Sequence, residues 1–120
     1  MANQVYDLVL DFEDHLKGDT WDGYDFQILD EITLVPVSLV GASIRAMFRL
    51  QGKSTKMYEM STALGTITIT NAVNGEFGLD EQIINFDAGI YLYDIEVTLA
   101  SGQVKTRIGG KWVIKQDVTY

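Results

Sequence analysis

The chain has 120 residues, of which 47% are hydrophobic and 22% are charged, a composition typical of folded globular proteins rather than disordered ones. It contains no cysteine, which excludes disulfide bonds, thiolate metal ligands and a thiol nucleophile. The formal net charge of −8 argues against nucleic-acid binding, because that function needs a basic face that displaces counterions from phosphates.

The sequence carries no sign of export or of membrane insertion. The opening stretch MANQVYDLVLDFEDHL lacks the basic start and apolar run of a signal peptide, and no stretch approaches the ~20 apolar residues that cross a bilayer. We therefore expect one soluble domain over residues 1–120, synthesised in a cytoplasm and not attached to a membrane.

The charge is concentrated at the start of the chain. Residues 1–31 contain nine acidic residues and one basic residue, whereas the remaining 89 residues contain eight of each, so the first quarter carries the whole imbalance of −8. The opposite sign gathers in the middle of the chain, at Arg45, Arg49, Lys53 and Lys56. This asymmetry favours a protein partner over a nucleic acid.

Apolar and polar residues alternate with a period of two along most of the chain, which is the pattern of half-buried strands. In the strand expected over residues 43–50, Arg45, Met47 and Arg49 face outward. The rows expected to face inward are, in chain order, Tyr6, Leu8, Leu10 and Phe12; Tyr24, Phe26 and Ile28; Ile44, Ala46, Phe48 and Leu50; Ile67 and Ile69; and Tyr91, Tyr93, Ile95, Val97 and Leu99.

Turn signals separate these strands. SGQ at residues 101–103 predicts a hairpin turn, and the glycine pair at residues 109–110 predicts a second turn or a bulge. The stretch GLDEQIINFDAG, residues 78–89, fits either a loop or a helical turn capped by Asp80, with Ile83, Ile84 and Phe86 tucked under the sheet. Short strands between such turns predict an all-β fold, a single immunoglobulin-like or related antiparallel β-sandwich.

The stretch GDTWDGYDF, residues 18–26, concentrates three aspartates, two glycines and three aromatic residues. Aligning an EF-hand calcium loop on the second glycine places Leu29 where the bidentate glutamate belongs, so that register fails. An irregular calcium site built from Asp19, Asp22 and Asp25 stays open. A turn in which these aspartates accept hydrogen bonds from local backbone N–H groups is the favoured interpretation.

No arrangement of residues indicates catalysis. Asp94 and Glu96 share one outward strand face, where a salt bridge to Lys105 or Arg107 in the next strand is a simpler interpretation than a glycosidase pair. The only histidine, His15, lies in a polar stretch and is expected at the surface, and the sequence has neither a nucleophile elbow nor a phosphate loop. We therefore expect a non-enzymatic protein without a cofactor.

The aromatic residues offer one further interpretation, a platform for stacking sugars. Tyr91 and Tyr93 belong to an inward row, so core packing accounts for them. Trp21, in a loop, and Tyr120, at the terminus, are the rings expected to be exposed. A carbohydrate-binding or adhesin-like module is therefore the alternative function.

Three phrases occur in a characteristic order: KGDTWDGYDFQILDE, PVSLVGASIRAMFRL and GIYLYDIEVTLASGQVKTRIGGKWVIKQDVT. In this order they resemble the small β-sandwich module of bacteriophage tail and baseplate proteins, and are similar to the N-terminal domain of baseplate upper proteins. The residues that carry the resemblance are Gly18, Asp19 and Thr20; Pro36, Leu39, Gly41 and Ala42 with Arg45 and Arg49; Gly89, Tyr91, Tyr93 and Asp94; and Gly110, Val113, Asp117, Val118 and Thr119.

The resemblance implies assembly rather than catalysis. It implies a rigid sandwich in a virion, made in the cytoplasm of a bacterial host, that docks to other virion proteins and commonly forms a symmetric ring or trimer. Members of that family usually continue beyond this module, whereas this sequence ends at Tyr120.

The charge asymmetry leads independently to an expectation of docking or self-association through surfaces of opposite sign. Met47 would supply an apolar anchor between two arginines. The alternative is that the opposite charges neutralise each other across the strands of one subunit. The residues expected to take part in docking are Arg45, Met47, Arg49, Lys53, Lys56 and Trp21.

Overall fold

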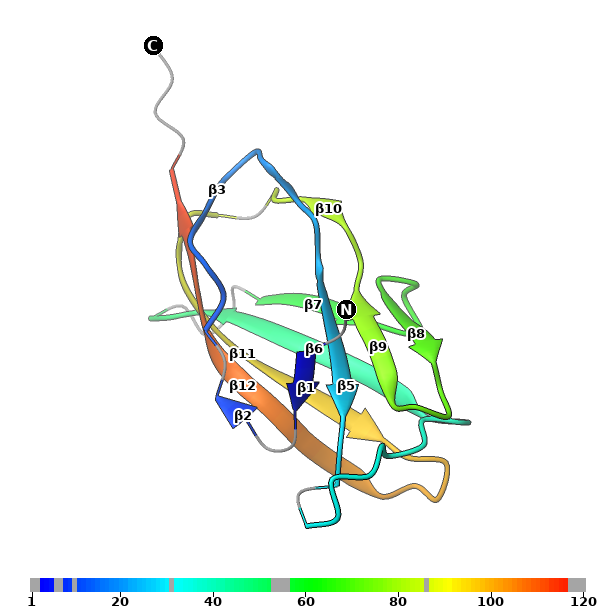
Figure 1. Cartoon of the computed structure of the whole chain (residues 1–120). Coiled ribbons are helices and arrows are strands. Elements are labelled where there is room, and N and C mark those ends of the chain that lie inside the picture. Colours follow the sequence, from blue (N-terminus) through cyan, green and yellow to red (C-terminus); the bar gives the residue numbers. More distant parts are fainter. Residues whose placement is uncertain are drawn as a thin grey trace.

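The structure is a computed structural model in which every regular element of the described residues is a β-strand (Figure 1). The all-β expectation is therefore confirmed. Within the same residues, no helix is long and apolar enough to cross a membrane. The described residues are 3–5, 8–9, 11–30, 32–52, 57–85 and 87–116, with the backbone alone at 3–5, 8–9, 57 and 105–107.

The larger sheet is built around a long hairpin of two strands. Its strands follow the order β2 (Leu8–Val9), β12 (Val104–Lys115), β11 (Gly89–Thr98), β6 (Ser43–Leu50) and β7 (Met57–Ser61), and β3 (His15–Leu16) also pairs with β12. The short strands β2 and β3 run parallel to β12, whereas the other pairs are antiparallel. The N-terminal part of the chain therefore forms one border of this sheet.

A four-stranded sheet faces the larger one, and a two-stranded ladder lies beside it (Figure 1). The four-stranded sheet has the order β1 (Asn3–Val5), β5 (Tyr24–Ile28), β9 (Glu76–Leu79) and β8 (Ile67–Asn71). The small ladder pairs β4 (Thr20–Trp21) with β10 (Gln82–Ile83). Because β4 and β5 are nearly contiguous, the chain passes from the small ladder directly into the four-stranded sheet.

The hydrophobic core lies between the two larger sheets and draws on both of them. Phe48 and Tyr93 are buried as expected, and Phe26 and Phe77 face them from the smaller sheet. Burial alternates along β6 and along β11, so the predicted inward rows of these strands are confirmed. The expected inward positions Tyr6, Leu8 and Leu10 have no described side chains.

The turn that joins β11 to β12 is confirmed. Leu99 donates its backbone N–H to the carbonyl of Gln103 at 2.9 Å, and Gly102 donates to the carbonyl of Leu99 at 2.8 Å. Gly102 has a φ of +89°, a conformation that glycine adopts without steric cost.

The glycine pair was expected to form a second turn or a bulge, and it forms neither. Gly109 and Gly110 lie inside β12, where they pair with Asp94 and Tyr93 of β11. Both glycines are extended, and neither takes a positive φ. The irregularity of this ladder lies earlier in β12. The consecutive β11 residues Ile95 and Glu96 pair with Ile108 and Thr106, so Arg107 is the extra residue of a bulge.

The described part of residues 78–89 contains no helical turn, which was one of the two expectations for this stretch. The strand β10 forms there instead. Asp80 does not cap a helix, because its carboxylate accepts a hydrogen bond from the Thr68 hydroxyl at 2.9 Å. Ile84 is buried, but Ile83 is 64% exposed and does not tuck under the sheet. Phe86 lies outside the described residues.

Candidate functional site

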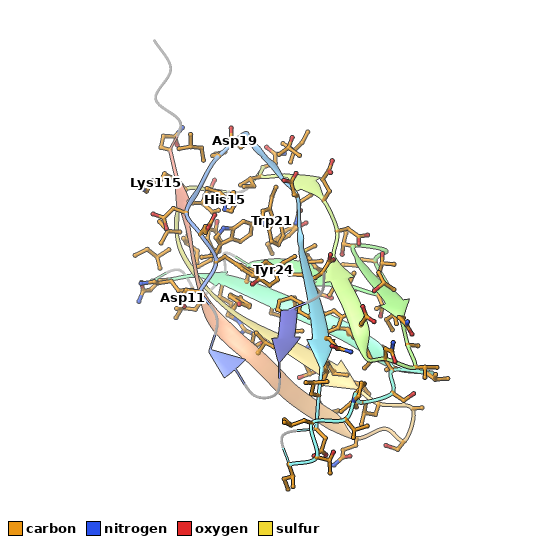
Figure 2. The ribbon with its side chains drawn as sticks, in the orientation of Figure 1. Asp11, His15, Asp19, Trp21, Tyr24 and Lys115 are labelled. Carbon is orange, nitrogen blue, oxygen red and sulfur yellow. The ribbon has the colours of Figure 1, made fainter. Side chains whose placement is uncertain are left out.

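The segment 11–24 forms an arch at one end of the molecule, and its first half runs along β12 (Figure 2). Phe12 donates its backbone N–H to the carbonyl of Lys111 at 3.0 Å, and the N–H of Lys111 returns a hydrogen bond to Asp11 Oδ1 at 3.0 Å. Further along, Lys17 donates to the carbonyl of Lys115 at 2.9 Å. These contacts hold the first half of the arch against the larger sheet.

The second half of the arch is held by the small ladder. Gly18 donates its N–H to the carbonyl of Ile84 at 2.8 Å, and Ile84 donates to the carbonyl of Asp19 at 2.9 Å. After β4, Gly23 takes a φ of +84° and the chain enters β5. The stretch GDTWDGYDF is therefore the return arm of an arch that connects the larger sheet with the smaller one.

Aromatic rings fill the space under the arch. Phe12 stacks on Tyr93 with ring centroids 4.7 Å apart and nearly parallel planes, and lies within 5.6 Å of Trp21, Tyr24 and Trp112. The indole rings of Trp21 and Trp112 are 4.6 Å apart. Ring pairs at these separations stabilise beyond the apolar area that they bury.

The expectation that Trp21 is exposed was wrong. Its side chain is only 4% exposed, because β4 turns Thr20 outward and Trp21 inward onto Trp112. Trp21 therefore offers no free face for a sugar or a partner. Tyr120, the other ring expected at the surface, lies outside the described residues.

His15 belongs to the same cluster rather than to an open surface. Its ring is half-buried, and its edge-to-face partner is Trp112 at 5.6 Å. Nδ1 lies 2.7 Å from the carbonyl oxygen of Glu13 and 3.0 Å from the indole Nε1 of Trp112. Only one of these contacts can be a hydrogen bond in a given tautomer, because Nδ1 donates to the carbonyl when protonated and accepts from the indole when not.

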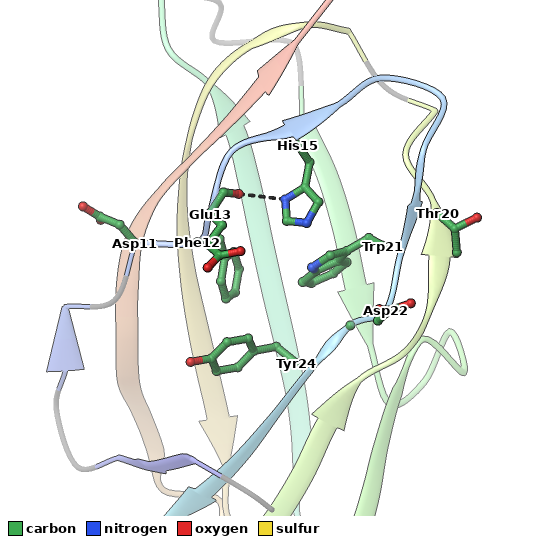
Figure 3. A pocket seen from close by; sticks show the side chains of 9 residues that line it. Asp11, Phe12, Glu13, His15, Thr20, Trp21, Asp22 and Tyr24 are labelled. Carbon is green, nitrogen blue, oxygen red and sulfur yellow. Dashed lines mark hydrogen bonds between the residues drawn. The ribbon is translucent and has the colours of Figure 1, made fainter. Parts of the chain in front are cut away.

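A pocket of about 390 Å³ opens between the two arms of the arch (Figure 3). Asp11 and Glu13 come from the arm beside β12, Asp22 comes from the opposite arm, and aromatic rings lie between the two. All three carboxylates are exposed, and none of the described lining residues is lysine or arginine. The described lining is Asp11, Phe12, Glu13, His15, Thr20, Trp21, Asp22, Gly23 and Tyr24.

The negative charge of the pocket reaches into the ring cluster. Burial raises the pKa of the Tyr93 phenol far above its usual value, and the carboxylate of Asp11 and the nearby phenol of Tyr24 raise it further. Tyr93 therefore stays neutral beside the pocket.

The structure does not bring the three possible calcium ligands together. Asp22 lines the pocket, Asp19 lies at the turn of the arch, and Asp25 lies on β5 opposite Gly78. In the described ranges, no group of three or more acidic, histidine or cysteine side chains is placed to hold a metal ion.

Calcium is accordingly expected to leave the folding equilibrium unchanged. An ion bound only by the folded state would raise stability by mass action, whereas loosely attracted ions would not. Thermal melting in EDTA and in millimolar calcium should give midpoints within about 2 °C of each other. A rise of many degrees on adding calcium would show that the aspartates gather around an ion.

The basic residues of β6 lie on the outer face of the larger sheet. Arg45 and Arg49 are exposed and Met47 is half-buried, as the alternation predicted. Arg45 lies 3.8 Å from Glu96, so part of the basic charge is balanced within the subunit, although such an exposed pair contributes little stability. The expected partners of Glu96, the bases at 105 and 107, have no described side chains, and Lys53 and Lys56 lie outside the described residues.

Comparison with known proteins identifies no relative. The chain matches no family model, and no curated protein is significantly similar to it.

Proposed function

We propose that this chain is a non-enzymatic assembly module, an immunoglobulin-like β-sandwich that docks onto other protein subunits. The observation that carries the proposal is the outer face of the larger sheet, which combines exposed apolar side chains with ordered charges. The resemblance to tail and baseplate modules makes a bacteriophage virion the setting that we propose for this docking.

The apolar part of this face is formed by neighbouring strands. Leu92 and Ile90 are 49% and 40% exposed although they belong to the longest ladder of the fold. Ile90 pairs across strands with Val113. Met47 lies two residues along β6 from Arg49, the residue opposite Leu92, so Met47 and Leu92 are diagonal neighbours on the same face. Exposed apolar residues that adjoin one another in this way are typical of interaction surfaces rather than of scattered surface residues.

Charged residues flank this apolar part in a regular order. Leu92 pairs with Arg49 on one side and with Lys111 on the other, so a cation stands on each side of Leu92. In the next row, Met47 stands between Glu59 and Asp94. Ordered charges around an apolar centre fix the orientation of a partner and speed association, which suits a subunit of a defined assembly.

Substitution of Leu92 by aspartate is expected to weaken association by at least about tenfold, because it places a charge in the apolar centre of the interface. Light scattering coupled to size exclusion, over a range of protein concentrations, measures this effect. Leu64→Asp is the matched control, because Leu64 is 62% exposed in the turn between β7 and β8 and lies away from this face. Equal behaviour of the two variants in a parent that self-associates would contradict the proposal, whereas a parent chain that stays monomeric throughout would leave only docking onto a different protein.

A carbohydrate-binding module is the alternative function. The pocket under the arch is where a sugar would bind, since its carboxylates can accept hydrogen bonds from hydroxyl groups. The burial of Trp21 leaves that pocket without the exposed stacking ring on which the alternative was based. Neighbouring genes for virion proteins would support assembly, whereas neighbouring genes for sugar use would support the alternative.

A further inference from the structure

We infer that the surface that receives the outer sheet face is the acidic pocket of a second copy, so that identical chains associate head to tail. This inference rests on the proposed function, because it names the partner of the same docking face. It adds that the pocket under the arch is the complementary half of the interface.

Charge distinguishes the two surfaces. Asp11, Glu13 and Asp22 line the pocket, although the Asp11 carboxylate points away from the rings and accepts the Lys111 N–H (Figure 3). None of the three forms an ion pair with any residue that the structure describes. Two other charged pairs near the arch are matched, since Lys17 Nζ lies 3.8 Å from Asp87 Oδ1 and Lys115 Nζ lies 3.2 Å from Asp14 Oδ2. The carboxylates of the pocket therefore carry negative charge that no described residue balances through an ion pair.

The outer face presents the matching cation. Arg49 is exposed, and no residue in the described ranges forms an ion pair with it, in contrast to Arg45. It stands in the row that continues through Leu92 to Lys111. The row therefore offers a cation, an apolar side chain and a second cation in sequence.

The pocket repeats this order with the opposite sign. Glu13 and Asp22 lie on opposite arms of the arch, and the half-buried ring of Tyr24 lines the pocket with them (Figure 3). A guanidinium group can donate two parallel hydrogen bonds to a carboxylate and can also lie against an aromatic ring. We therefore place Arg49 of the second copy against these carboxylates, with Leu92 beside Tyr24.

The geometry of the contact follows because the chains are identical and the two surfaces are different. Pocket against pocket is disfavoured, because it would bring six unbalanced carboxylates together. A contact between two different surfaces of the same chain is heterologous, so it repeats from copy to copy and closes into a ring or continues as a filament. Either product is an assembly in which every copy uses both surfaces.

Two charge-reversed variants test the inference. Arg49→Glu removes the cation and leaves the pocket intact, whereas Asp22→Arg alters the pocket and leaves the outer face intact. Each variant alone is expected to associate at least about tenfold more weakly than the parent at low salt. Mixed in equal amounts, they should associate with each other again, because the intact face of one variant meets the intact pocket of the other and the two altered surfaces are again of opposite sign. The doubly substituted chain, carrying both changes, should recover self-association.

Glu76→Arg is the control for net charge, because Glu76 lies on β9 in the other sheet and does not line the pocket. It should associate like the parent, and high salt should weaken the parent, since exposed charges are screened over about a Debye length. If Asp22→Arg associates normally while Leu92→Asp does not, the inference is wrong and the docking face still stands. If the mixture of the two charge-reversed variants stays monomeric, or the parent never self-associates, the head-to-tail contact is rejected.

Discussion

Replacing Phe48 with alanine is expected to lower the free energy of unfolding by about 3–5 kcal/mol. Phe48 is fully buried in the central part of β6, and its ring lies 5.4 Å from that of Tyr93 and 5.7 Å from that of Trp112. Removing the ring leaves a cavity that these large neighbours cannot fill by small movements, so the loss exceeds the transfer free energy of the side chain. Urea or guanidinium unfolding, monitored by tryptophan fluorescence, measures the difference.

Met47→Ala is the control, because Met47 is the adjacent residue of the same strand and faces outward. Its truncation is expected to cost less than about 1 kcal/mol, since a half-exposed side chain leaves no enclosed cavity. A large loss at Met47 and a small loss at Phe48 would show that the alternation of β6 is shifted by one residue. Met47 and the two arginines would then point inward.

The long strands could be predicted because their alternation is uninterrupted and one face of each is buried. A shift by one residue in β6 or β11 would move every apolar side chain to the outside, so pattern and burial agree strongly there. The glycine pair in β12 could not be interpreted in the same way. Glycine is compatible with both an extended strand and a turn, and the choice depends on the pairing of β12 with β11.

The candidate site was predictable in its composition and not in its arrangement. The burial of Trp21 depends on β10 and on Trp112, which lie about 60 and 90 residues further along the chain, and no local pattern encodes those contacts. The half-buried position of His15 has the same origin. One local signal was available, because Phe12 is flanked by acids on both sides and Trp21 is followed by one. Each arm of the pocket is a short segment in which an aromatic residue stands beside an acidic one.

The second large effect is expected at Gly23, the glycine at which the arch enters β5. Gly23→Ala should lower the free energy of unfolding by about 3 kcal/mol or more, because two penalties add. Its φ of +84° is unfavourable for any residue with a Cβ, and a Cβ placed there would collide with the backbone carbonyl oxygen of Leu79. A backbone oxygen in a paired strand cannot move aside as a flexible side chain could.

Gly18→Ala separates the two penalties. Gly18 has a φ of +97° in the same arch, but a Cβ there would meet no atom within 4 Å. Its substitution should therefore cost only the conformational part, about 1–2 kcal/mol. Equal losses at the two glycines would mean that the close approach of Gly23 to Leu79 is not what holds the arch against β9. Asp22 and Tyr24 flank Gly23 and line the pocket. If Gly23→Ala, and not Gly18→Ala, abolishes head-to-tail association while the chain is still folded, the positions of Asp22 and Tyr24 depend on the close approach of Gly23 to Leu79.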